Sequence, residues 1–321
     1  MNHLRLTRRH VIAGAVMGAA TLAWQRGGRR ASARTAGPAA AAGSLTIGGD
    51  LEVNRLGFGA MRVTGPGIWG EPRSNREARS VLRRVIELGV NFIDTADAYG
   101  PEVSERLIAE ALHPYPKDLV IATKGGVVRP GPSKWAPNGT PGHLREACEQ
   151  SLKRLKLDRI DLYQLHAIDP KVPLEESLSE LARLQKEGKI RHVGVSNFKL
   201  DELIRARRTV PVASVQNRYN VVDRASEDVL EYCAREHIAF IPWAPLARGT
   251  PEALADKARG EAFTTIATAH GMTGFQMAIS WLLAKSPAML PIPGTSSVAH
   301  LEENVAAARV TLSPRELTAI G

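Results

Sequence analysis

The sequence has few cysteines, few aromatic residues and no long hydrophobic run. Aromatic side chains make up 5% of the 321 residues, and the two cysteines, Cys148 and Cys233, form neither a CxxC pair nor a Cys/His cluster. This pattern excludes a disulfide framework and lacks the spacing of a zinc site, so no metal is expected. Both cysteines fall within helical patterns, where we expect them to be small buried hydrophobic side chains.

Acidic residues are absent from the first 33 positions. Six of the 42 basic residues and none of the 33 acidic ones lie there, so the formal net charge of +9 falls to +3 for the rest of the chain. A charge this small does not indicate a nucleic-acid partner. With 44% hydrophobic and 23% charged residues, the chain is long enough for one large α/β domain or two small ones.

The N-terminus has the order of parts typical of a signal peptide. The paired Arg8 and Arg9 precede a weakly apolar run, residues 11–24, and the small residues Ala31-Ser32-Ala33 follow. The segment resembles a twin-arginine signal, which predicts recognition by the twin-arginine export machinery, cleavage near Ala33 and an exported, periplasmic product. A run of about 14 residues is too short to span a bilayer, so no stable membrane anchor is expected. The alternative is a disordered basic extension on a cytoplasmic protein.

The rest of the chain divides into a short linker and one repeating domain. Residues 34–44, rich in Gly, Ala and Pro, are predicted to be a flexible linker. Residues 45–321 alternate short β-rich runs with amphipathic stretches. Strands are expected at Arg55–Ala60, Asn91–Asp94, Leu119–Thr123, Ile160–Leu165, Ile190–Val195, Ala213–Gln216, Ala239–Pro242 and Met289–Ile292. Helices are expected at Asn75–Leu88, His143–Leu155, Leu174–Lys186, Ala225–Glu236 and Phe275–Lys285.

The alternation of strands with helical stretches, and the presence of eight strands in one domain, favour a closed (β/α)8 TIM barrel, an α/β fold, over a doubly wound sheet. Residues 45–53, with Gly48-Gly49-Asp50 at the centre, are predicted to form a β-hairpin ahead of the first barrel strand, where it could plug the bottom of the barrel. The glycines at 57 and 59 are no dinucleotide-binding fingerprint, because the third glycine is missing and no helix follows directly.

Four polar residues fall at the carboxyl ends of three successive predicted strands, where this fold places its active site. Asp94 and Tyr99 follow the second strand, Lys124 the third and His166 the fourth. Reduction of a carbonyl group requires a proton donor. A buried ammonium beside a phenol would stabilise the phenolate and so lower the pKa of the phenol. We therefore expect Tyr99 to be the general acid, Asp94 to hold Lys124 charged and oriented, and His166 to hydrogen-bond the substrate oxygen. Each residue alone has an ordinary structural explanation, but the set does not.

These residues belong to a wider set of motifs. The others are Leu56-Gly57-Phe58-Gly59, Gly194-Val195-Ser196-Asn197-Phe198, Gln216-Asn217, Pro242-Trp243-Ala244-Pro245-Leu246 and Pro291-Ile292-Pro293-Gly294-Thr295. Together they resemble the aldo-keto reductase family over nearly all of residues 45–321. The resemblance implies reduction of aldehydes and ketones with NADPH, with NADH as the alternative cofactor, and a small-molecule carbonyl substrate.

The resemblance also implies a set of cofactor contacts. Ser196, Asn197 and Gln216 would meet the nicotinamide carboxamide, Trp243 would stack on its ring, and the loop from Ala244 to Gly249, with Arg248, would cover the pyrophosphate. The residues expected at the cofactor are Gly59, Met61, Asp94, Ser196, Asn197, Gln216, Trp243, Ala244, Pro245, Leu246, Gly249, Gly294, Thr295, Ser297, His300, Glu303 and Asn304.

Two positions depart from the family pattern. Gly294 and His300 stand where many members carry the Lys and Arg that hold the 2′-phosphate, which weakens the preference for NADPH over NADH. Substrate contacts are expected from Met61, Trp69, Trp135 and His166, although either tryptophan could instead pack on the rim. A different class of function remains open, a nicotinamide-binding sensor or accessory subunit on the same fold.

Overall fold

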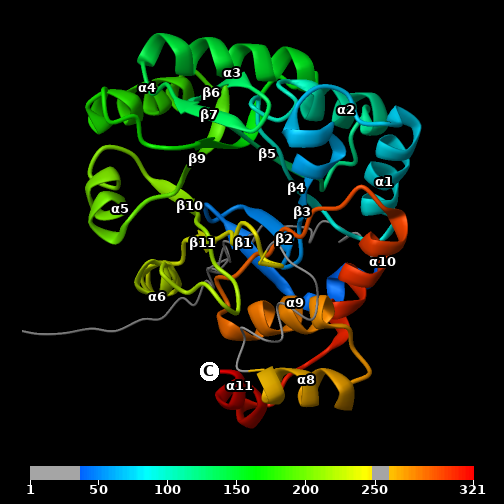
Figure 1. Cartoon of the computed structure of the whole chain (residues 1–321). Coiled ribbons are helices and arrows are strands. Elements are labelled where there is room, and N and C mark those ends of the chain that lie inside the picture. The colour runs from blue at the N-terminus through cyan, green and yellow to red at the C-terminus, as the bar shows by residue number, and fades with distance from the viewer. Residues whose placement is uncertain (1–36, 248–259) are drawn as a thin grey trace, which may run out of the picture. The chain divides into compact units, whose positions relative to one another are not determined.

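The computed structural model describes residues 37–247 and 260–321. Within this part, seven parallel strands form one sheet in the order β11-β10-β9-β8-β5-β4-β3, with helices around it (Figure 1). The strands of this sheet are β3 (Phe58–Gly59), β4 (Phe92–Asp94), β5 (Val120–Gly125), β8 (Ile160–Leu165), β9 (Ile190–Ser196), β10 (Val212–Gln216) and β11 (Ala239–Phe240). The α-helices are α1 (Asn75–Glu87), α2 (Val103–Leu112), α3 (Pro141–Leu155), α4 (Leu174–Lys186), α5 (Leu200–Ala206), α6 (Glu227–Arg235), α8 (Gly260–Ala269), α9 (Gly274–Lys285), α10 (Val298–Ala306) and α11 (Pro314–Ile320).

Residues 289–292 fill the eighth position of the barrel without becoming a regular strand. Met289 forms a parallel bridge with Phe240 of β11, and on the other side Gly57 N donates to Pro291 O at 2.9 Å. Contact with both edge strands closes the sheet into a barrel. The strand predicted at Met289–Ile292 is therefore correct in position, but it forms only an isolated bridge and no continuous ladder, because Pro291 has no N–H to donate.

A hairpin packs into the amino-terminal end of the barrel. Its strands β1 (Ser44–Ile47) and β2 (Leu51–Asn54) pair antiparallel, as predicted. Ile47, Leu51 and Val53 join the barrel interior, a core that also contains Phe92, Val120, Ala122, Leu162, Ala213, Ala239, Ile241, Leu290 and Ile292. The hairpin thus closes the end opposite the predicted active site with apolar side chains.

The helices bury one apolar face each, as α1 illustrates. Ser74 caps its start by accepting a hydrogen bond from Glu77 N at 3.2 Å, and Gly89, with φ of +79°, follows its end. Its buried residues Ala78, Val81, Leu82 and Val85 repeat at intervals of three and four. They pack against the outer faces of the neighbouring strands, in the cluster that also contains Phe58 and Ile93.

Two features differ from the sequence predictions. Residues 38–42, expected within a flexible linker, form a 3-10 helix, η1 (Pro38–Ala42), in which Ala39 is fully buried and donates its N–H to Leu88 O. A second hairpin, β6 (Val127–Gly131) and β7 (Lys134–Pro137), lies outside the predicted strands. Pro130, Gly131 and Pro132 interrupt any regular alternation there.

The remaining helical turns are short. They are the 3-10 turns η2 (Ala60–Val63), η3 (Pro66–Ile68) and η4 (Ala307–Arg309). Among the helices described, none combines the length and the hydrophobicity needed to cross a bilayer.

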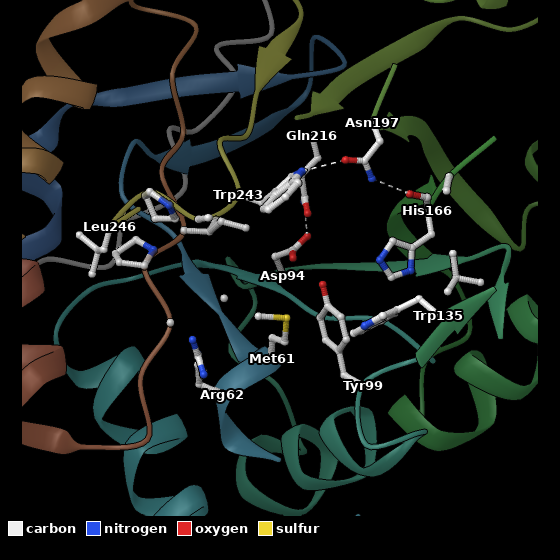
Figure 2. Close-up of a pocket in the computed structure, with 18 of the residues that line it drawn as sticks. Met61, Arg62, Asp94, Tyr99, Trp135, His166, Asn197, Gln216, Trp243 and Leu246 are labelled. Atoms are coloured by element: carbon white, nitrogen blue, oxygen red, sulfur yellow. Dashed lines mark hydrogen bonds between the residues drawn. The ribbon is translucent and has the colours of Figure 1, made fainter. Parts of the chain in front are cut away.

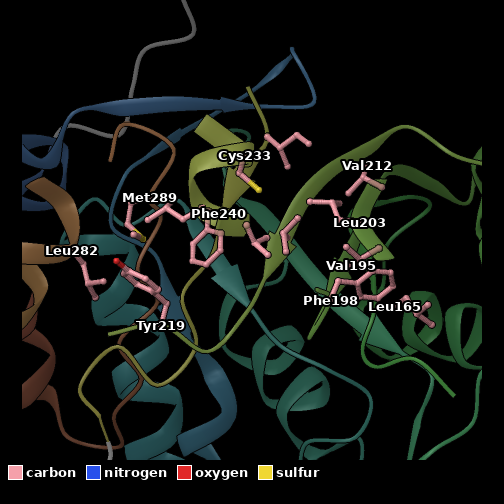
Figure 3. Packing of buried hydrophobic residues seen from close by; sticks show 14 of the residues in the cluster. Leu165, Val195, Phe198, Leu203, Val212, Tyr219, Cys233, Phe240, Leu282 and Met289 are labelled. Atoms are coloured by element: carbon pink, nitrogen blue, oxygen red, sulfur yellow. The ribbon is translucent and has the colours of Figure 1, made fainter. Parts of the chain in front are cut away.

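Buried clusters of hydrophobic side chains fill the space between strands and helices. The largest cluster includes Val195 and Phe198 near β9, Tyr219 and Phe240 near β11, and Leu282 of α9 (Figure 3). Cys148 of α3 and Cys233 of α6 both lie in this cluster, and both are fully buried and free of disulfide bonds. The prediction that both cysteines act as core residues is confirmed.

Candidate active site

A cavity of about 640 Å³ opens at the carboxyl ends of the barrel strands (Figure 2). Its lining residues come from both halves of the chain. Those that the sequence predicted are Gly59, Met61, Asp94, Tyr99, Trp135, His166, Asn197, Gln216, Trp243, Ala244, Pro245, Leu246 and Gly294. The residues that line it without having been predicted are Arg62, Val127, Ala167, Phe275, Ile292 and Pro293. The site is therefore where a (β/α)8 fold is expected to place it.

Strand alternation carries Lys124 into the barrel interior. Val120 and Ala122 of β5 face the interior core, and Lys124 is the next residue on that face. Its side chain is fully buried, and Nζ donates to Asp94 Oδ1 at 2.6 Å, Thr95 O at 2.8 Å and Tyr99 Oη at 3.2 Å. These three bonds use all three protons of the ammonium group.

The carboxylate of Asp94 is held from two further strands. Gln164 of β8 and Gln216 of β10 both donate from Nε2 to Asp94 Oδ2, at 3.0 Å and 2.7 Å. The role of Gln164 was missed by the sequence analysis, although a signal existed. Leu162, Gln164 and His166 share one face of their strand, so Gln164 had to point the same way as the predicted His166.

The buried charges set the protonation states of Lys124 and Tyr99. Burial by itself would lower the pKa of Lys124, but Asp94 and Tyr99 outweigh it and the net direction is upward, so the side chain stays an ammonium. Burial also raises the pKa of Tyr99; Lys124 opposes that rise and Asp94 adds to it. The net direction is opposite to the predicted lowering, because the loss of hydration outweighs the effect of the nearby cation. Tyr99 is therefore a protonated phenol at neutral pH.

His166 lies against Tyr99 as a neutral imidazole. The two rings meet edge to face with centroids 5.9 Å apart (Figure 2). Burial lowers the pKa of His166 well below its ordinary value, and the charges of Lys124 and Arg129 lower it further. Its Nδ1 is buried without a hydrogen-bond partner. A neutral imidazole has one N–H to offer, so His166 can donate to a carbonyl oxygen beside the Tyr99 hydroxyl.

Asn197 and Trp243 form a part of the cavity wall that adjoins His166. Trp243 Nε1 donates to Asn197 Oδ1 at 2.9 Å, and Asn197 Nδ2 donates to His166 O at 3.1 Å. Asn197 has φ of +63° and Ala244 φ of +52°, left-handed conformations that are uncommon outside glycine. Such backbone conformations concentrate at functional sites, where the surrounding packing maintains them. An indole face and two carboxamides, those of Asn197 and Gln216, suit an aromatic ring that carries an amide.

The chain passes very close to itself at Gly59 and Gly294. A Cβ at position 294 would lie 2.3 Å from Gly59 O, and one at position 59 would lie 2.7 Å from Ile292 O. Any side chain at position 294 would therefore collide with the backbone of β3. This contact gives a physical reason why no lysine stands there.

Arg129, in β6, supports the wall that carries Trp135. Its guanidinium carbon lies 3.7 Å from the Trp135 ring centroid. Nε donates to Lys134 O at 2.7 Å, Nη1 to Ile68 O at 2.8 Å and Ala98 O at 2.9 Å, and Nη2 to Gly67 O at 3.0 Å. One side chain thus joins three segments around the cavity. The sequence analysis missed it because the hairpin itself was not recognised.

Several predicted residues lie outside the cavity wall. Ser196 is buried and donates to Gln216 O at 2.9 Å, and Trp69 lies on the far side of Arg129, 5.8 Å from its guanidinium carbon. The predicted residues at the start and along α10 also do not line the cavity, and they are Thr295, Ser297, His300, Glu303 and Asn304. Arg248 and Gly249 lie outside the described residues. Within residues 37–247 and 260–321, no group of three His, Cys, Asp or Glu residues could hold a metal ion.

Comparison with known proteins identifies the family. Residues 55–321 match the Aldo/keto reductase family. An uncharacterized oxidoreductase of Schizosaccharomyces pombe is 53% identical over 284 residues, which cover 88% of this chain and 90% of that protein. Pyridoxine 4-dehydrogenase of Escherichia coli is 41% identical over 278 residues, covering 85% of this chain and 95% of that enzyme.

A solved structure with bound cofactor is similar in the same region. The aldo-keto reductase from Klebsiella pneumoniae in complex with NADPH superimposes with a TM-score of 0.73 at 28% identity, covering 86% of this chain and 93% of that one. The fold is accordingly a (β/α)8 barrel. The NADPH in that structure supports a nicotinamide cofactor, and the names of the two relatives support an oxidoreductase activity. The chain belongs to the aldo/keto reductase family.

Proposed function

We propose that this protein reduces aldehydes and ketones to alcohols, with Tyr99 as the general acid. The observation that carries the proposal is the 3.2 Å contact between Lys124 Nζ and Tyr99 Oη, at the floor of the cavity. A phenol held next to a buried ammonium can release its proton during the reaction, because the phenolate left behind is stabilised.

The residues of the chain divide the proton chemistry among them. His166 donates its N–H to the substrate oxygen and fixes the position of that oxygen beside Tyr99. Tyr99 transfers its proton to the oxygen as negative charge develops there, and Lys124 stabilises the resulting phenolate. Asp94, held by Gln164 and Gln216, keeps Lys124 charged and oriented. When bound, a reduced dinucleotide would supply the hydride that the carbonyl carbon receives and would be oxidised in doing so.

The donor set around the cavity fits a nicotinamide ring. Asn197 and Gln216 offer carboxamides, and Trp243 offers an indole face along the same wall. Because Gly294 leaves no room for a lysine and His300 lies at the start of α10, we propose that the enzyme uses NADPH with only a modest preference over NADH. Comparison of the dissociation constants of both dinucleotides, from quenching of tryptophan fluorescence, tests this point.

The substrate is proposed to be an aldehyde of moderate size. Met61, Trp135 and His166 form the wall nearest Tyr99, and the rings of Tyr99 and Trp135 meet edge to face at 6.3 Å. These side chains suit a flat or apolar carbonyl compound. Because the E. coli relative is a pyridoxine 4-dehydrogenase, we include pyridoxal among the compounds to test.

A direct experiment is the Tyr99→Phe variant. Wild-type protein is mixed with NADPH and a panel that contains pyridoxal, methylglyoxal and nitrobenzaldehyde, and the loss of NADPH absorbance is followed. We expect the variant to lose carbonyl reduction while its affinity for NADPH stays nearly unchanged. An equal loss of both would make Tyr99 a structural residue. Tight NADPH binding by the wild type without turnover of any aldehyde would instead indicate a sensor or accessory subunit.

A further inference from the structure

A second cavity adjoins the active site. It has a volume of about 620 Å³ and shares Met61, Arg62 and Trp135 with the larger cavity. We call it the annex, defined by residues 61–68, 72–74, 77 and 78 together with Ser133, Trp135 and Ser296. Because three side chains line both spaces, the two cavities are directly adjacent.

Two arginines of the annex, Arg62 and Arg73, have no ionic partner among the described residues. Neither Arg62 nor Arg73 forms an ion pair with any residue that the structure describes. The contrast with nearby arginines is clear, since Arg79 and Arg106 both bind Glu110 and Arg84 binds Glu87 and Glu302. Exposed arginines that line a cavity without a carboxylate partner are suited to bind an anion.

Acidic side chains do not cancel this charge. Glu77 is the acidic residue on the annex wall, against Arg62 and Arg73. Behind Trp135, Arg129 adds another cation that is 9% exposed and donates to backbone carbonyls. In the described part of the chain, no carboxylate pairs with Arg129. The wall shared by the two cavities, with Arg62 on it and Arg129 behind Trp135, therefore carries excess positive charge.

We propose that the annex binds an anionic group, a carboxylate or a phosphate, on the far end of the carbonyl substrate. This inference rests on the proposed carbonyl reduction and adds the chemical class of the substrate. The carbonyl lies at Tyr99 and His166, the middle of the molecule passes Trp135 and Met61, and the anion is held by Arg62 and Arg73. The hydroxyl groups of Ser74 and Ser133 lie on the same wall and can add neutral donors.

The test compares aldehydes that differ only in charge. Succinic semialdehyde is paired with its methyl ester, and glyceraldehyde 3-phosphate with glyceraldehyde. We expect kcat/KM for each charged member to exceed that of its neutral partner by about tenfold, and the excess to shrink as salt is added. The two pairs also separate the two anion sources, since a carboxylate and a phosphate are tested independently.

The variants Arg62→Gln and Arg73→Gln locate the effect. Each should lower the ratio of charged to neutral kcat/KM by about threefold, mainly through KM of the charged aldehyde. Arg83→Gln is the matched control, because Arg83 is an exposed arginine on α1 that lines neither cavity and has no ion pair within the described residues. Its ratio should equal that of the wild type.

Three outcomes would overturn the inference. Equal kcat/KM for both members of each pair would leave the carbonyl reduction intact and remove the anion site. Failure to reduce any of the four aldehydes would remove the proposed function as well. In a parallel fluorescence titration, an Arg62→Gln variant that binds NADPH more weakly but NADH normally would assign the arginine to the cofactor phosphate instead of the substrate.

Discussion

Lys124 and Asp94 form an ion pair of 2.6 Å between side chains that are 0% and 2% exposed. A buried pair of this kind is costly to break, because the remaining charge loses its partner and cannot be hydrated. In this protein, the pair also determines which way the ammonium points, since the third proton of Lys124 reaches Tyr99. Stability and proton transfer are therefore linked through one carboxylate.

The Asp94→Asn variant should lose both stability and activity. Without the carboxylate, burial lowers the pKa of Lys124, and the ammonium beside Tyr99 is lost. We expect kcat to fall by about 100-fold or more and the free energy of unfolding to fall by about 3–5 kcal/mol. Steady-state kinetics and urea unfolding measure the two effects. Asp158→Asn, a change at an exposed aspartate, is the control, and the idea fails if both variants retain wild-type kcat.

The pH dependence of aldehyde reduction should show a wide plateau. The general acid must be protonated, so activity is present below the pKa of Tyr99 and is lost as pH rises through it. Because burial raises that pKa above about 10, the basic limb should lie above pH 10. His166 is neutral down to well below pH 6.5, since burial lowers its pKa. A pH profile of kcat that declines between pH 7 and pH 9 would contradict the assigned proton donor.

Substitution of Arg129 should weaken substrate binding more than chemistry. Arg129→Lys keeps a positive charge but cannot donate to Ile68, Ala98, Gly67 and Lys134 at once. We expect KM for aldehydes to rise about tenfold with a smaller change in kcat, and the melting temperature to fall. Arg208→Lys, on the exposed surface, should change neither quantity. A large drop in kcat at constant KM would mean that Arg129 acts on Tyr99 directly.

Neither cysteine should react in the folded protein. Burial raises the pKa of both Cys148 and Cys233 to about 12, and both side chains are fully buried. The thiolate is the reactive form, so Ellman's reagent should detect almost no thiol before unfolding and two per chain in denaturant. Rapid labelling of one thiol in native buffer would show that its helix opens locally.

We further propose that the first 33 residues direct export by the twin-arginine route. In a bacterial host with this pathway, the product should be periplasmic and shorter by about 33 residues, with a new N-terminus near Ala33. Replacing Arg8 and Arg9 together by lysine should leave the full-length protein in the cytoplasm. An antibody against the barrel distinguishes the two forms, and an uncleaved cytoplasmic wild type would rule the signal out.

Local pattern, together with the family resemblance, predicted the barrel and the positions of Asp94, Tyr99, Lys124 and His166 at its strand ends. Alternation along a strand fixes which side chains face the interior, so Asp94 follows Phe92 and Lys124 follows Ala122 on the same face. The same alternation places Gln164 on the interior face, but a glutamine has no proton chemistry of its own that would mark it as a candidate. Strand ends were predictable because parallel strands in a barrel all finish on one side.

Other features depended on contacts between segments far apart in the chain. Examples are the close approach of Gly59 and Gly294, the joining of three segments by Arg129, and the presence of Arg62 and Arg73 on the wall of one cavity. Each depends on where connecting segments lie in space, and their conformations follow no regular period. The direction of the Tyr99 pKa also needed the tertiary structure, because it depends on how completely the phenol is removed from water. The sequence by itself determined which chemical groups are present and on which face of a strand they lie. The packing of segments far apart in the chain decided how those groups are charged and what shape of substrate can reach them.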